Sequence, residues 1–194
     1  MKSIDELVEI YNRNHSKNED WKLSNFKNNS RLLEELIVDA VWGIEPRMNR
    51  DKHQFRVPKP VLEEMIKILQ EPGIVEELRG CQNFDDIFTI IYECRIKKFG
   101  PLSVYDTSLR LGVAFGHYPT VVYLHQGALE GAIRLLGRDV VERNSKYFCG
   151  NPDYPYVSPD ILTEPLNKLE PYHIENFLCI NKNNFLIASN GLHL

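Results

Sequence analysis

The chain has 194 residues and a formal net charge of −4; 43% of its residues are hydrophobic and 26% are charged. This length and composition allow a buried core without disulfide or metal support, and they exclude an intrinsically disordered chain. The negative net charge disfavours a protein that binds nucleic acid over its whole surface, but it is compatible with a local basic patch.

Several helix signals follow one another along the first half of the chain. In SIDELVEIYNRN, Ser3 and Glu6 have the spacing of a capping box, and apolar residues then recur on one helical face. SRLLEELIVDAVWG predicts a helix that ends at Gly43, and PVLEEMIKILQ predicts one that begins at a proline. NFDDIFTIIYECRIKK predicts a helix that Asn83 caps and that ends in cationic residues.

The second half of the chain continues the helical pattern. LSVYDTSLRLGVAFG predicts a helix with Ser103 as its N-cap; Asp106 either completes this cap or forms a buried pair with Arg110. In GALEGAIRLLG, Gly127 and Gly131 lie four residues apart and permit a close crossing with another helix. We expect a long ordered loop near residues 144–163, where Pro, Tyr, Asn and Asp are frequent, and then further helix.

These signals predict a mainly α-helical protein. We count about seven helices and no convincing alternating strands, so residues 1–194 are expected to form a single helical domain that contains an αα-hairpin. No stretch approaches the roughly 18 apolar residues of a membrane helix, and MKSIDELVEIYNRNH lacks the apolar core of a signal peptide. We therefore expect a cytoplasmic protein with no membrane contact; its oligomeric state is not predicted.

The cysteines indicate neither a disulfide framework nor a metal site. Cys81, Cys94, Cys149 and Cys179 form no C-x-x-C pair and match no zinc signature. The sequence therefore predicts free thiols, no metal site and no cofactor.

The hairpin is expected between two helices over Asn83–Lys98 and Ser103–Phe115, joined by the turn Phe99–Leu102. Phe99 and Leu102 would anchor this turn in the core, and Gly100 would supply an unusual backbone dihedral or a close approach. Backbone amides at such a turn, together with nearby cations, can bind a phosphate. An αα-hairpin that serves only as scaffold would have the same sequence pattern.

The segment from Asp85 to Gly137 resembles the helix-hairpin-helix region of DNA glycosylase-like folds. The resemblance implies a turn that contacts the nucleic-acid backbone, but this turn carries a single glycine, Gly100, followed by Pro101. It does not imply glycosylase activity, because TVVYLHQG has no carboxylate where that family has its catalytic aspartate. The motif GPLSVYDTSLRLG also looks like one in small uncharacterised bacterial proteins, and this second likeness implies no function.

Two groups of cations lead to the favoured functional hypothesis. Lys97 and Lys98 precede the expected turn, and five cations stand against two acids between Glu45 and Pro60: Arg47, Arg50, Lys52, Arg56 and Lys59. Such groups suit a polyanion. We therefore expect a binding module for a phosphate-bearing partner, with nucleic acid favoured, whose site residues are these cations and Gly100. An ordinary solvated loop remains the alternative for the second group.

Two other classes of function remain open. An enzyme of unknown class could use Tyr105, Asp106, His117 and His125 for general acid–base chemistry if these side chains meet in a cleft. A protein-interaction module could instead present the aromatic segment Tyr147–Tyr156.

Overall fold

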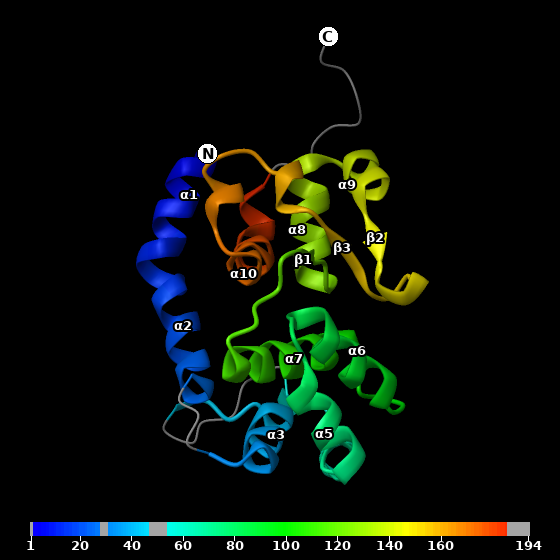
Figure 1. The fold of residues 1–194 in the computed structure, drawn as a ribbon. Coiled ribbons are helices and arrows are strands. Elements are labelled where there is room, and N and C mark those ends of the chain that lie inside the picture. Colours follow the sequence, from blue (N-terminus) through cyan, green and yellow to red (C-terminus); the bar gives the residue numbers. More distant parts are fainter. Residues whose placement is uncertain (1, 28–30, 47–53, 186–194) are drawn as a thin grey trace. The chain divides into compact units, whose positions relative to one another are not determined.

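The computed structural model describes residues 2–27, 31–46 and 54–185. The protein is mainly α-helical, as predicted, and it forms two compact units (Figure 1). Unit 1 combines Met1–Asn18 with Thr120–Leu194, and unit 2 is Glu19–Pro119. The expectation of one domain over residues 1–194 stays a prediction. No helix in the described ranges is long and apolar enough to cross a bilayer.

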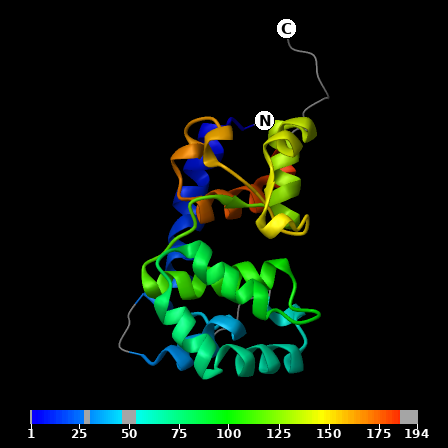
Figure 2. The same cartoon turned by 45° about the vertical axis from the view of Figure 1, so that its right-hand side comes forward.

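Unit 2 is built from helices. In chain order they are α2 (Lys17–Leu23, whose first two residues belong to unit 1), η2 (Ser24–Phe26), α3 (Leu33–Trp42), η4 (Gln54–Arg56), α4 (Lys59–Leu69), α5 (Pro72–Gly80), α6 (Phe84–Cys94) and α7 (Pro101–Phe115). The predicted signals Asn83 and Gly43 are confirmed: Asn83 accepts a hydrogen bond from the amide of Asp86 at 3.0 Å, and Gly43 ends α3 in the left-handed conformation. The helix α7 packs against α3 and α6 (Figures 1 and 2).

A buried cation, Arg110, links α7 to α3. Arg110 is only 8% exposed, and its Nη1 donates to the carbonyl oxygen of Ala40 at 3.1 Å. That carbonyl lies near the carboxyl end of α3, where the helix dipole favours a positive charge. The Oδ2 atom of Asp106 lies 3.8 Å from the Nη2 atom of Arg110. Of the two predicted roles of Asp106, the structure therefore shows the pair with Arg110. The predicted cap by Ser103 is wrong, because Gly100 is the N-cap of α7.

Unit 1 combines helices with a small sheet. Its elements are α1 (Ile4–Tyr11), the π-helical η1 (Asn12–Ser16), β1 (Val122–Tyr123), α8 (Gln126–Leu136), α9 (Arg138–Asn144), β2 (Lys146–Tyr147), η5 (Phe148–Gly150), β3 (Pro155–Val157), η6 (Pro159–Ile161), η7 (Leu166–Lys168), α10 (Pro171–Asn181) and η8 (Lys182–Asn184). The strands are antiparallel in the order β1-β3-β2, and Val122 pairs with Val157. The segment expected as a loop near 144–163 thus holds β2 and β3, which are too short to show an alternating pattern.

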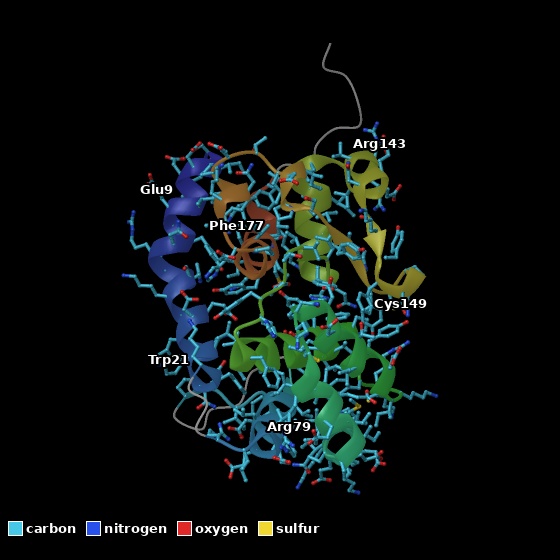
Figure 3. All side chains as sticks on the ribbon, in the orientation of Figure 1. Glu9, Trp21, Arg79, Arg143, Cys149 and Phe177 are labelled. Carbon is cyan, nitrogen blue, oxygen red and sulfur yellow. The ribbon has the colours of Figure 1, made fainter. Side chains whose placement is uncertain are left out.

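The core of unit 1 lies between α1, α8 and α10. The capping box that begins α1 is confirmed, with Ser3 and Glu6 each accepting from the backbone amide of the other. Leu7 and Val8 of α1 are buried in the same cluster as Phe177 of α10. Figure 3 shows Phe177 inside this unit, while the exposed Glu9 lies on its outer side.

The crossing of α8 and α10 depends on two glycines, as the sequence predicts. A Cβ at Gly131 would lie 2.2 Å from the backbone carbonyl oxygen of Leu178, and a Cβ at Gly127 would lie 2.4 Å from the Sγ atom of Cys179. At Gly131 a Cβ would meet the backbone of α10, whereas at Gly127 it would meet the end of the Cys179 side chain. The two positions should therefore respond differently to the same substitution.

We expect Gly131→Ala to lower the free energy of unfolding by at least about 1–3 kcal/mol, because α10 must move away from α8. Gly127→Ala should also destabilise the protein, and adding Cys179→Ala should restore part of the loss by removing Sγ. The measurement is urea unfolding of the single and double variants. Rescue of Gly131→Ala by Cys179→Ala, or no loss at Gly131, would contradict the described crossing.

Candidate functional site

The hairpin is formed by α6 and α7, but its boundaries differ from the prediction. The helix α6 ends at Cys94 and not at Lys98, because Arg95 takes an extended conformation with φ −62° and ψ 140°. The guanidinium of Arg95 donates to the carbonyl of Tyr92 and lies 3.6 Å from the centre of the Tyr92 ring. The backbone of Arg95 therefore ends α6, and its side chain packs on the Tyr92 ring of that helix.

The bend between the helices is a tight turn with two lysines at its centre. The amide of Phe99 donates to the carbonyl of Ile96 at 3.0 Å, which makes Lys97 and Lys98 the two central residues of a four-residue turn. Lys98 has φ +76°, the sign that a type II turn requires at this position. Phe99 is only 2% exposed and anchors the bend in the core.

Gly100 does not have the role predicted for it. Its φ is −80°, which any residue can adopt, and a Cβ built at Gly100 has no atom within 4 Å. The unusual dihedral belongs to Lys98 instead, where a side chain in the left-handed region costs about 1–2 kcal/mol. The turn therefore retains a lysine at a position where glycine would be less strained.

Both lysines of the turn are accessible to solvent. Lys97 and Lys98 are exposed, and no residue in the described part of the chain forms an ion pair with either of them. Pro101 follows closely and begins α7, whose first turn has no side-chain cap. Because helix N-termini leave backbone amides without intrahelical partners, the amides of Leu102 and Ser103 point toward the bend. Two cations and the positive end of a helix dipole thus occur within seven residues, 97–103.

The second group of predicted cations is only partly described. Arg47, Arg50 and Lys52 lie outside the described residues. Arg56 is exposed on η4, and Lys59 at the start of α4 is 3.5 Å from Glu63. Within the described ranges, no hydrogen bond or ion pair joins Arg56 or Lys59 to Lys97 or Lys98.

The residues of the enzyme hypothesis have other contacts. Tyr105 is 2% exposed on α7, beside the pair of Asp106 and Arg110. The ring of His117 bonds to the carbonyl of Cys81 at 3.3 Å and so links the ends of α7 and α5. His125 belongs to unit 1, where it is the N-cap residue of α8 without a side-chain cap bond. In the described contacts, Asp106 is thus engaged with Arg110, and His117 with the backbone of Cys81.

The thiols of Cys81 and Cys94 have raised pKa values. All four cysteines are free, as predicted. Burial, with the charges of Asp86 and Glu77, raises the pKa of the Cys81 thiol to about 11, and burial with nearby carboxylates also raises the pKa of Cys94. Because the thiolate is the nucleophilic form, the raised pKa values disfavour a nucleophilic role for Cys81 and Cys94.

One buried polar pair was missed by the sequence analysis. The Tyr11 hydroxyl and the His173 Nδ1 atom are 2.9 Å apart in the core of unit 1, and the Tyr172 ring lies 4.2 Å from the His173 ring. This hydrogen bond joins α1 to α10 across 162 positions of sequence, and no local pattern could predict it. The pair holds α1 in place.

Comparison with known protein families, curated proteins and solved structures finds no match to this chain. Among the described side chains, no three or more of His, Cys, Asp and Glu are grouped so that they could hold a metal ion. The candidate site is the turn of Lys97 and Lys98, where two exposed lysines lie at the centre of the bend.

We expect Lys98→Gly to raise the free energy of unfolding by about 0.5–1 kcal/mol, since relief of the left-handed strain exceeds the entropy cost of glycine. Lys97→Gly removes the same charge without relief of that strain and serves as the matched control. Gly100→Ala should change stability by less than about 0.5 kcal/mol. Chemical denaturation measures all three, and a large loss in Gly100→Ala would contradict the described turn.

Proposed function

We propose that the protein binds a phosphate-bearing partner, with nucleic acid as the favoured class, at the turn of Lys97 and Lys98. One observation carries the proposal: the two lysines occupy the exposed centre of a turn, carry no ion pair among the described residues, and adjoin the uncapped start of α7. Cations and helix N-terminal amides together are a recurrent means of holding phosphate groups.

The strain at Lys98 favours a functional role for this side chain. A residue in a strained backbone conformation persists where the surrounding structure enforces it, and such residues gather at functional sites. At this turn, glycine would satisfy the same dihedral at lower cost, so selection for stability alone would favour glycine. A functional role for its cation would explain why this position carries lysine.

The expected interaction is weak and sensitive to salt. Two lysine contacts to a single-stranded nucleic acid predict a slope of about −1.4 for log affinity against log salt concentration. The contacts reach phosphate groups and read no base edges, so little sequence preference is expected. A contact made by only these two lysines is compatible with the net charge of −4 on the whole chain.

The test measures fluorescence anisotropy of a short single-stranded oligonucleotide over a salt series, with the wild-type protein and with Lys97→Glu/Lys98→Glu. We expect wild-type binding at low salt with the slope given above, and loss of both affinity and slope in the variant. The matched control is Lys17→Glu/Lys146→Glu, which changes net charge equally through two exposed lysines of unit 1.

Equal losses in the hairpin variant and in the control would show that net charge alone matters, and would refute the assignment to this turn. Absence of wild-type binding at low salt would refute the proposed function itself.

A further inference from the structure

We draw no further inference here: the strongest candidate, the ring cluster of Tyr11, His15, Tyr172 and His173 in unit 1, carries none because its described contacts, the hydrogen bond between Tyr11 and His173 and the packing of the rings, account for it as the link between α1 and α10 already described.

Discussion

The hairpin depends on the burial of α7 in unit 2. Arg110 joins this helix to the carboxyl end of α3, and Gly112 permits the carbonyl of His117 to lie 2.5 Å from the position a Cβ would take. Both contacts fix the helix along its length, and Phe99 fixes the bend that leads into it. Phe99 is directed into the core, whereas the neighbouring side chains of Lys97 and Lys98 are exposed to a partner.

The tip of the turn carries a small positive charge on an acidic protein. Lys97 and Lys98 are exposed and have no ion pair among the described residues, while the chain as a whole carries −4. A polyanion that reaches the two lysines also meets the negative potential of the whole protein. This balance favours weak binding that is sensitive to salt.

Local signals in the sequence predicted local structure well. Ser3, Asn83 and Gly43 were correctly assigned as helix ends because capping depends on neighbouring residues. The end of α6 was misplaced because cations at a helix end suit the helix dipole, whereas Arg95 here turns extended and binds back to Tyr92. Gly100 was assigned the unusual dihedral by residue type alone, and it is Lys98 that adopts it.

Contacts between segments far apart in the sequence were harder to predict. The close crossing at Gly127 and Gly131 could be predicted from their spacing, although its partner, α10, could not. The pair of Tyr11 and His173 and the two- and three-residue strands depend on segments far apart in the chain, so no window of sequence contains their signal. The same limit applies to the candidate site: the lysines were identified from composition, but their free, central position in a turn required the structure.

The most direct test of the account is a titration of the nitrogen-15-labelled protein with a short single-stranded oligonucleotide, followed by amide NMR. The account predicts that the largest shifts occur at Lys97, Lys98, Leu102 and Ser103, which share the tip of the hairpin. Largest shifts in unit 1, or none at the tip when binding is saturated, would contradict it.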